Sequence, residues 1–325
     1  MIQQTTFLDL ALHHKTRITR REVFLGEMEG VVPWKELVDL IEPYYPTGQR
    51  GRPPMGLERM LRLYFVQLWN NYSDEATEDA LYDMPILARL VGMDLTLERV
   101  PDSTTLMNFR HLLEQNGLAT RLLDRINALL EARGLRLREG TIVDATLIAA
   151  PPSTQNEKQQ RDPEMHQTQK GNPWYFGMKM PIGVDAASGL THTAVGTAAK
   201  VSDVVMTADL LHGDEPRVYA DAGYTGVSQR EEHADTAVAW PVALKRGKVK
   251  ALPEDEIGDL TRKIERLKAR VRAKVEHPFH VIKNLFHHRK TRYRGLEKNT
   301  HQFQVLFALA NLYMTRKRVM AMMAV

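Results

Sequence analysis

The sequence predicts an α/β protein in two parts. Over residues 1–138, apolar side chains recur at helical spacing between turn signals, which favours helices. From Gly140 onward, β-branched runs separated by turn residues favour the strands of a sheet, and helical spacing returns from about residue 254. We therefore expect a helical N-terminal region, residues 1–138, followed by a mixed-sheet domain with C-terminal helices, residues 139–325.

The helices of the N-terminal region are expected between recognisable start and stop residues. Ser73 or Asp74 should cap the third helix and Asp102 or Ser103 the fifth, because their side-chain oxygens accept hydrogen bonds from orphan backbone N–H groups. Gly117 is well placed to end the fifth helix. The expected helices span residues 20–46, 55–70, 74–81, 86–91, 103–115 and 118–133.

The second part begins with strands and ends with helices. Strands are expected at residues 141–148, 175–184, 191–197 and 217–220, with a further candidate at 238–244. A helix is expected at 203–211, and the polar stretch 151–173 reads as a long loop. After about residue 254 the chain should be helical to its end, and the apolar run 302–323 should pack in a core.

Composition and charge restrict the class of protein. The chain has no cysteine, which excludes disulfides, thiolate zinc sites and a cysteine nucleophile. The first residues lack the pattern of a secretory signal, and no stretch approaches a membrane span, so we expect a soluble cytoplasmic protein. Residues 262–298 carry 13 basic and 3 acidic side chains within an overall net charge of +4. This concentration favours a polyanionic partner, above all nucleic acid, although a solvated basic helix would look the same.

Three acidic residues stand out from their surroundings. Asp144 lies within an apolar strand and Asp221 at the end of another, where an ionised carboxylate is costly unless a metal or a neighbouring group compensates it. Two such acids on separate strands favour a shared metal site over two unrelated structural carboxylates. Glu276 lies in a basic run, one helical turn after Arg272, so a simple ion pair between them is the alternative interpretation.

These acids lie in motifs that resemble those of DDE transposases, and among them the insertion-sequence-five family of bacterial mobile elements. The resemblance runs from about residue 5 to 300. The motifs occur in the family's order and read Gly51-Arg-Pro-Pro54, Pro101-Asp-Ser-Thr-Thr105, Gly140-Thr-Ile-Val-Asp144-Ala-Thr146, Arg161-Asp-Pro-Glu-Met-His166, Phe176-Gly-Met-Lys179, Ile182-Gly-Val-Asp185, Asp221-Ala-Gly-Tyr-Thr-Gly226 and Lys274-Val-Glu-His-Pro-Phe279.

The resemblance implies an RNase H-like catalytic domain behind a helical N-terminal region that binds DNA ends. It further implies that Asp144, Asp221 and Glu276 form the catalytic triad and bind Mg²⁺, for which Mn²⁺ can substitute. Cutting and strand transfer of the element, by a homodimer or larger assembly on double-stranded DNA, would follow. Arg272 and Lys283 match a Tyr-Arg-Glu-Lys pattern of related families, but Ala269 replaces its tyrosine.

Several basic and polar residues are expected to contact DNA, with ordinary surface or structural roles as the alternative. They are Lys179, Arg272, Lys283, Arg289, Lys290, Arg292 and Arg294, together with Asn108 and Arg110 on the helix from Ser103. The main rival function is a catalytically inactive or domesticated sequence-specific DNA-binding protein. The presence of all three acids argues against that rival. An active transposase would be associated with the bacterial nucleoid when bound to DNA.

Overall fold

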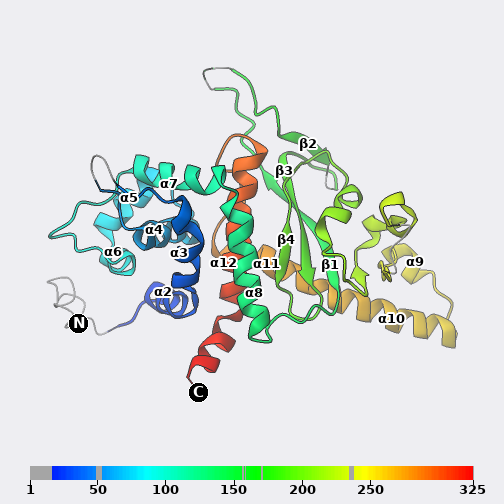
Figure 1. Cartoon of the computed structure of the whole chain (residues 1–325). Helices are drawn as coiled ribbons and strands as arrows, with labels where there is room; N and C mark the ends of the chain where they lie inside the picture. The colour runs from blue at the N-terminus through cyan, green and yellow to red at the C-terminus, as the bar shows by residue number, and fades with distance from the viewer. Residues whose placement is uncertain are drawn as a thin grey trace. The chain divides into compact units, whose positions relative to one another are not determined.

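The computed structural model describes residues 17–48, 53–155, 157, 159–169, 171–233 and 238–324. The N-terminal stretch tested above for a secretory signal and the first two residues of the Gly51 motif therefore lie outside the described residues. Two compact units are formed by Met1–Leu118 with Leu312–Val325 and by Ala119–Asn311. The first is helical and the second contains the sheet (Figure 1).

The helices of the first unit largely follow the expected order. The expected helix over residues 20–46 is divided in two, because Pro33 disfavours helical geometry at the preceding residue, Val32, which is extended. A 3₁₀ turn, η1, then covers Glu42–Tyr44. The α-helices are α2 (Arg20–Val31), α3 (Trp34–Ile41), α4 (Leu57–Asn70), α5 (Asp74–Asp83), α6 (Pro85–Val91) and α7 (Ser103–Gln115).

Helix α4 forms the centre of the first unit. Its side chains from Met60 to Trp69 are all buried except Arg62, and its rings meet those of neighbouring helices. The ring of Tyr64 packs edge-on against Phe109 of α7, with centroids 6.1 Å apart. Phe65 lies against Trp34 of α3 at 5.6 Å. Aromatic burial of this kind supplies much of the apolar area that holds a small helical unit together.

The caps of α5 and α7 lie where the sequence places them. Ser73 Oγ accepts the backbone N–H of Ala76 at 3.0 Å, and Asp102 Oδ1 accepts that of Thr105 at 2.7 Å. Each bond satisfies one of the orphan donors in the first turn of the helix. The predicted start of both helices is thereby confirmed.

The second unit is built on a six-stranded mixed sheet with β3 at its centre. Strand β1 runs antiparallel along one edge of β3, and β6 pairs in parallel with β1. The other edge of β3 pairs in turn with β2, β5 and β4. The strands are β1 (Thr141–Ala149), β2 (His166–Gln169), β3 (Trp174–Asp185), β4 (Thr191–Ala194), β5 (Thr197–Ala198) and β6 (Val218–Tyr219).

Five expectations for this unit need correction. The strand expected at 191–197 is divided into β4 and β5, and the helical run expected from about residue 254 is interrupted between Leu285 and Leu296. The stretch 151–173 contains β2, a strand made of polar residues that pairs with Trp174–Gly177. The expected helix at 203–211 consists of two 3₁₀ turns, η2 (Asp203–Met206) and η3 (Ala208–Leu210). The candidate strand at 238–244 forms only isolated bridges, from Ala239 to Arg217 and from Val242 to Ala220.

Helices surround the sheet of the second unit. They are α8 (Leu118–Ala132), α9 (Arg246–Lys250), α10 (Glu256–Arg272), α11 (Glu276–His280) and α12 (Leu296–Met323). Helices α8 and α12 lie side by side along β4, since Asn127 and Asn311 both donate to the carbonyl of Thr191 (Figure 1). Phe303 and Phe307 of α12 are buried, which confirms the predicted core role of this run.

Candidate active site

The parallel pairing of β1 with β6 brings Asp144, inside β1, close to Asp221, which follows the end of β6. The two strands are parallel, with Ile142 opposite Tyr219. Counted two residues further along both chains, the same register puts Asp221 beside Asp144. Strand ends in α/β sheets are the usual position of ligand sites, because the chain turns away there and leaves the edge open.

Gly140 allows this close pairing at the start of β1. Its φ of +145° is one that residues with a side chain rarely adopt. A Cβ at this position would lie 2.7 Å from the carbonyl oxygen of Arg217, which itself accepts the N–H of Thr141. The glycine that opens the Asp144 motif therefore has a backbone role in joining β1 to the segment that carries Asp221.

Asp144 is largely buried and lies among other charges. Burial raises the pKa of its carboxyl to about 6, and the carboxylates of Asp221 and Glu276 raise it too. The backbone N–H of Ala145, at 2.8 Å, and the guanidinium of Arg272 act in the opposite direction. The acids selected from the sequence are thus within electrostatic reach of one another.

Glu276 reaches this site from an irregular stretch of helix. Helix α10 ends at Arg272, a 3₁₀ turn, η7, covers Ala273–Val275, and Glu276 opens the short α11. Pro278 does not break the helix, because the chain stays helical through His280 and then widens into a π-turn at Val281–Leu285. Glu276 itself is exposed. Such local changes of helical pitch are common at functional sites.

Arg272 and Lys283 both reach β1 beside Asp144. A guanidinium nitrogen of Arg272 lies 3.4 Å from Asp144 Oδ2, a contact that replaces the simple pairing with Glu276 considered from sequence. Lys283 Nζ donates to Thr146 Oγ1 at 2.6 Å and to the carbonyl of Leu147 at 2.8 Å. Because residues two apart on a strand share a face, Thr146 brings this ammonium to the same face as Asp144.

Lys179 has a different environment. It is the cross-strand partner of Leu147, so its side chain lies on the face of the sheet opposite to Asp144. Its ammonium contacts Asp203 Oδ1 and the carbonyl of Val201, both at 2.9 Å. The structure therefore does not bring Lys179 to the three carboxylates, and these contacts hold η2 against β3.

The basic segment after the π-turn runs along the end of β1. Lys290 bridges in parallel to Ala149, and the N–H of Thr291 donates to the carbonyl of Ala149 at 2.8 Å. The side chains of Arg289, Lys290 and Arg294 are exposed, whereas Arg292 is half-buried. Positive charge is therefore displayed at the C-terminal end of β1, five residues along the strand from Asp144.

Asn108 and Arg110, the two residues of α7 that are expected to contact DNA, differ in their exposure. Asn108 is exposed. Arg110 is buried and forms a two-pronged ion pair with Asp74, at 2.7 and 3.0 Å. A guanidinium that is buried and paired in this way cannot contact a DNA phosphate. We therefore reassign Arg110 from DNA contact to the core of the first unit.

Tyr224 is a residue that the sequence reasoning passed over although it lies in the Asp221 motif. It is buried with Val143, Val218 and Val227, and its hydroxyl has no hydrogen-bond partner among the described residues. Burial, followed by the nearby carboxylates, raises the pKa of this hydroxyl. Its position three residues after Asp221 in this motif is the sequence signal that could have found it.

A second cluster of ionisable groups lies at the start of β1. His192, His212 and Glu215 place their ligand atoms within 4.8 Å of one another, whereas the three carboxylates around Asp144 are not grouped so tightly among the described residues. Glu215 already accepts the N–H groups of His212 and Gly213, at 2.7 and 2.8 Å. Burial lowers the pKa of His192 to about 3, and nearby Arg136 also disfavours positive charge there. We therefore assign the cluster to anchoring the loop that precedes β6.

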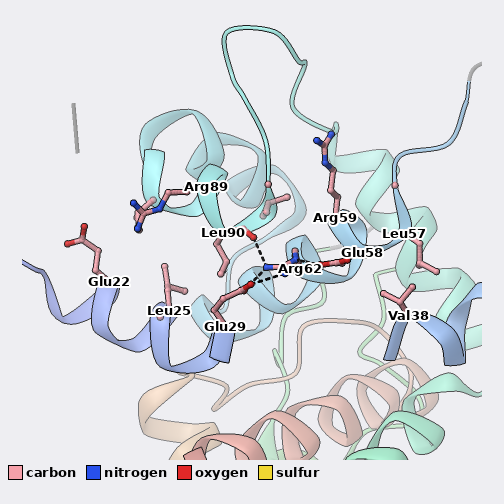
Figure 2. Close-up of a pocket in the computed structure, with 15 residues that line it drawn as sticks. Glu22, Leu25, Glu29, Val38, Leu57, Glu58, Arg59, Arg62, Arg89 and Leu90 are labelled. Carbon is pink, nitrogen blue, oxygen red and sulfur yellow. Dashed lines mark hydrogen bonds and ion pairs between the residues drawn. The ribbon is translucent and has the colours of Figure 1, made fainter. Parts of the chain in front are cut away.

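A pocket of about 760 Å³ belongs to the first unit and contains none of the three carboxylates. Figure 2 shows Arg62 directed into the region between α2, α4 and α6, where it bonds to Glu29, Glu58 and the carbonyl of Leu90. Three glutamates and three arginines line this pocket together with apolar side chains, and Arg59 and Arg62 are paired with Glu98 and Glu29, so the lining has no excess of positive charge. Such a lining does not favour a nucleic-acid phosphate.

The residues around Asp144 fit a divalent cation. Asp144, Asp221 and Glu276 offer hard carboxylate oxygens, the ligands that Mg²⁺ and Mn²⁺ prefer. Burial and, after it, repulsion from the other two carboxylates raise the pKa of Asp144, and a bound cation relieves that repulsion. The pairing with Arg272 is long, so it compensates the carboxylate only in part.

Sequence comparisons with known families agree with this geometry. The family described as "Transposase DDE domain" matches residues 135–312, more than half of the chain. The family described as "Transposase domain (DUF772)" matches residues 12–112. No solved structure matches the chain. Among the described residues, none of the helices combines the length and apolar content needed to cross a bilayer.

The family fits both units of the fold. Its catalytic domain is of the RNase H-like α/β class, which agrees with a mixed sheet followed by C-terminal helices, behind an N-terminal helical part. Proteins of this family act on DNA and generally require a divalent metal. Membership of the insertion-sequence-five family stays a prediction. The chain belongs to the DDE transposases of insertion sequences.

Proposed function

We propose that this transposase cuts and joins the DNA of its element by divalent-metal-dependent phosphoryl transfer, with Asp144, Asp221 and Glu276 as the metal ligands. The observation that carries the proposal is the parallel pairing of β1 with β6, whose register, continued by two residues, sets Asp144 of β1 beside Asp221 after β6. Burial raises the pKa of Asp144 most, and the nearby carboxylates of Asp221 and Glu276 add to this effect, which supports the grouping.

The residues of the site would bind the metal, contact the DNA phosphate and orient the Asp144 carboxylate. When bound, divalent cations supply Lewis-acid activation of the attacking oxygen and stabilisation of the leaving oxygen. Asp144 and Asp221 would hold them from the rigid sheet, and Glu276 from the helix. Lys283, on the same face of β1 as Asp144, would contact a phosphate next to the scissile one. Arg272 keeps the Asp144 carboxylate oriented through its ion pair.

The surface of residues 262–298 would hold the DNA backbone. It carries ten more positive than negative charges, and part of it runs along the end of β1. Arg289, Lys290, Arg292 and Arg294 are the proposed phosphate contacts in its second half, and Asn108 an additional contact on α7. Residues 1–138 would bind the element's ends. Two ends joined to one target require two active sites, so the acting form would be a homodimer or larger.

Replacing Arg289, Lys290 and Arg294 together by Ala should flatten the salt dependence of DNA binding. Each lost phosphate contact is expected to reduce the slope of log affinity against log salt by about 0.9. Fluorescence anisotropy with duplex DNA over a range of salt concentrations measures this slope. Lysine at Arg289 and Arg294 is the matched control, because it keeps the charge and should keep the slope. An unchanged slope in the triple Ala variant would show that the segment is only solvated.

Metal-dependent nicking tests the proposed function directly. The purified chain is incubated with a supercoiled plasmid that carries the DNA segments flanking its coding region, in Mg²⁺, in Mn²⁺ or with EDTA. We expect nicks at the ends of the element in either metal and none with EDTA. An inactive or domesticated DNA-binding protein would instead shift the same DNA in a gel without nicking it in any of the three conditions.

A further inference from the structure

Helix α10 of the second unit carries a row of exposed aliphatic side chains. Ile257, Leu260, Ile264 and Leu267 are 74%, 59%, 44% and 62% exposed. We call these four residues the α10 seam. Figure 1 shows α10 extending past the edge of the sheet towards α9, so that its first turns project from the unit.

The spacing of the α10 seam is that of a coiled-coil contact. Steps of three, four and three residues place all four side chains on one stripe of the helix, with isoleucine at the a positions and leucine at the d positions. In an antiparallel pair, the isoleucines at a would face the leucines at d of the partner helix. Isolated exposed leucines are ordinary on protein surfaces, but a continuous apolar stripe marks an interaction site.

A separate stripe of α10 already holds the helix on its own unit. Glu265 accepts the N–H of Leu244 at 2.8 Å, and Lys268 Nζ donates to the carbonyl of Val242 at 3.1 Å. Arg262 bonds to the carbonyl of Leu252 at 3.2 Å. The helix is therefore fixed in place by polar contacts, and the α10 seam is not needed for that attachment.

The charges of α10 favour one orientation of a partner helix. Its first turn carries Glu256 and Asp259, while Arg266 and Arg270 lie in its second half. Two parallel copies of this helix would place like charges together at both ends. Two antiparallel copies bring Glu256 of one towards Arg270 of the other, in both directions at once.

We propose that the α10 seam pairs with the α10 seam of a second copy of this chain in an antiparallel, two-stranded contact. The contact is self-complementary, because the same four residues supply both sides of a twofold interface. Ile257 then lies beside Leu267 of the second copy, and Leu260 beside its Ile264. The pairing does not depend on the proposed chemistry at Asp144.

The contact is expected to be weak between free molecules. A helix of 17 residues is about 25 Å long, and one pair of such helices buries less than the roughly 1,600 Å² of a standard stable interface. Two copies held on one DNA would meet at a high effective concentration, which strengthens a weak contact without adding new ones. The seam would therefore join copies chiefly after both have bound DNA.

Cross-linking tests both the partner and the orientation, because the chain has no cysteine of its own. Full-length Ile257→Cys and Leu267→Cys proteins are mixed at high concentration under mild oxidation. A disulfide between the two variants should form at least about tenfold faster than one between Ala269→Cys copies, since disulfides need Cα atoms within about 7 Å. Ala269 lies on the same helix, off the seam.

Two outcomes of this experiment would overturn the proposal. Disulfides confined to like copies, Ile257→Cys with itself, would show a parallel contact. Rates equal to those of Ala269→Cys would show that the α10 seams do not meet. The hybrid disulfide is the only supporting result, and nuclease activity plays no part in the readout.

A second measurement uses variants without cysteine. Leu260→Ser with Leu267→Ser should raise the dissociation constant of the dimer at least about tenfold in sedimentation equilibrium, whereas Ala269→Ser should not change it. Unchanged circular dichroism would show that the seam variant is folded. Co-sedimentation with anionic phospholipid vesicles tests whether the α10 seam binds a membrane surface instead, as basic amphipathic helices can. Seam-dependent vesicle binding without self-association would overturn the proposal.

Discussion

Replacing Asp144 by Asn is expected to abolish nicking and strand transfer, with a loss of at least about a thousandfold, because a neutral amide cannot hold the cation that carries the charge of the transition state. DNA binding should stay within about twofold, since the positive surface of residues 262–298 is unchanged. The measurements are the plasmid nicking assay and a gel shift with the same DNA. Asp209→Asn, an exposed aspartate of the same unit, is the matched control and should keep full activity.

The stability of the same variant gives an independent test of the electrostatic argument. Burial raises the pKa of Asp144 to about 6, above its ordinary value, so the wild-type carboxyl stabilises the fold fully only at acid pH. That contribution is lost as the pH rises through about 6, because the folded state then has to bury a charge. In metal-free protein at pH 8, Asp144→Asn should therefore unfold at a higher temperature than wild type. Its free energy of unfolding should be larger by about 1–3 kcal/mol.

The gain should shrink towards pH 4, where the wild-type carboxyl is protonated. Differential scanning calorimetry at both pH values measures it, and Asp209→Asn should show neither effect. Addition of Mg²⁺ should raise the melting temperature of wild type more than that of Asp144→Asn, since a ligand stabilises only the state that binds it. A lower melting temperature for Asp144→Asn at pH 8 would mean that its pairing with Arg272 outweighs its burial.

Replacing Arg110 by Ala is expected to destabilise the first unit by about 3–5 kcal/mol, the usual cost of removing one partner of a buried ion pair. Arg110 holds both carboxylate oxygens of Asp74, and Gln67 donates to the same carboxylate at 2.7 Å. Without the guanidinium, the half-buried carboxylate of Asp74 keeps its negative charge with only neutral donors. Urea unfolding followed by circular dichroism measures the change.

Asn108→Ala is the matched control on the same helix. Asn108 is exposed, so its replacement should alter the free energy of unfolding by less than about 0.5 kcal/mol. Normal unfolding of Arg110→Ala combined with weaker DNA binding would restore the role in DNA contact that the sequence suggested. The pair of variants therefore separates a structural from a DNA-binding role for α7.

Elements specified by neighbouring residues could be predicted from the sequence. Ser73 and Asp102 cap their helices because an N-cap needs only a side-chain oxygen and the next turn of the chain. Gly117, with φ +58°, follows the end of α7 for an equally local reason. Strand β1 was recognisable because its residues are β-branched and apolar from Thr141 onward.

Elements that depend on distant partners could not be predicted in this way. Strand β2 is polar and is a strand only because the edge of β3 offers it hydrogen bonds. Residues 238–244 look like a strand but meet their neighbours only at Ala239 and Val242. Amino-acid preference for strands is weak compared with the effect of pairing and burial. The neighbouring strands therefore decide whether such a segment forms a strand.

The same distinction applies to the candidate site. Asp144 and Asp221 could be selected because an acid in or after an apolar strand conflicts with its surroundings. Lys179 and Arg110 were selected as surface cations, but whether a cation is exposed depends on which acid lies opposite it. Asp203 and Asp74 take those positions from other parts of the chain. No local pattern reveals such long-range pairs.

The pairing of β1 with β6 also determines when, during synthesis, a chain can become active. Strands β2 to β5 are made between Asp144 and Asp221, and Glu276 emerges only after α10 is complete. A nascent chain on the ribosome therefore carries Asp144 well before the other two carboxylates that we propose as its partners. Since domains fold as units once their sequence is available, an unfinished or truncated chain would leave DNA intact. Cleavage would thus be restricted to fully translated molecules.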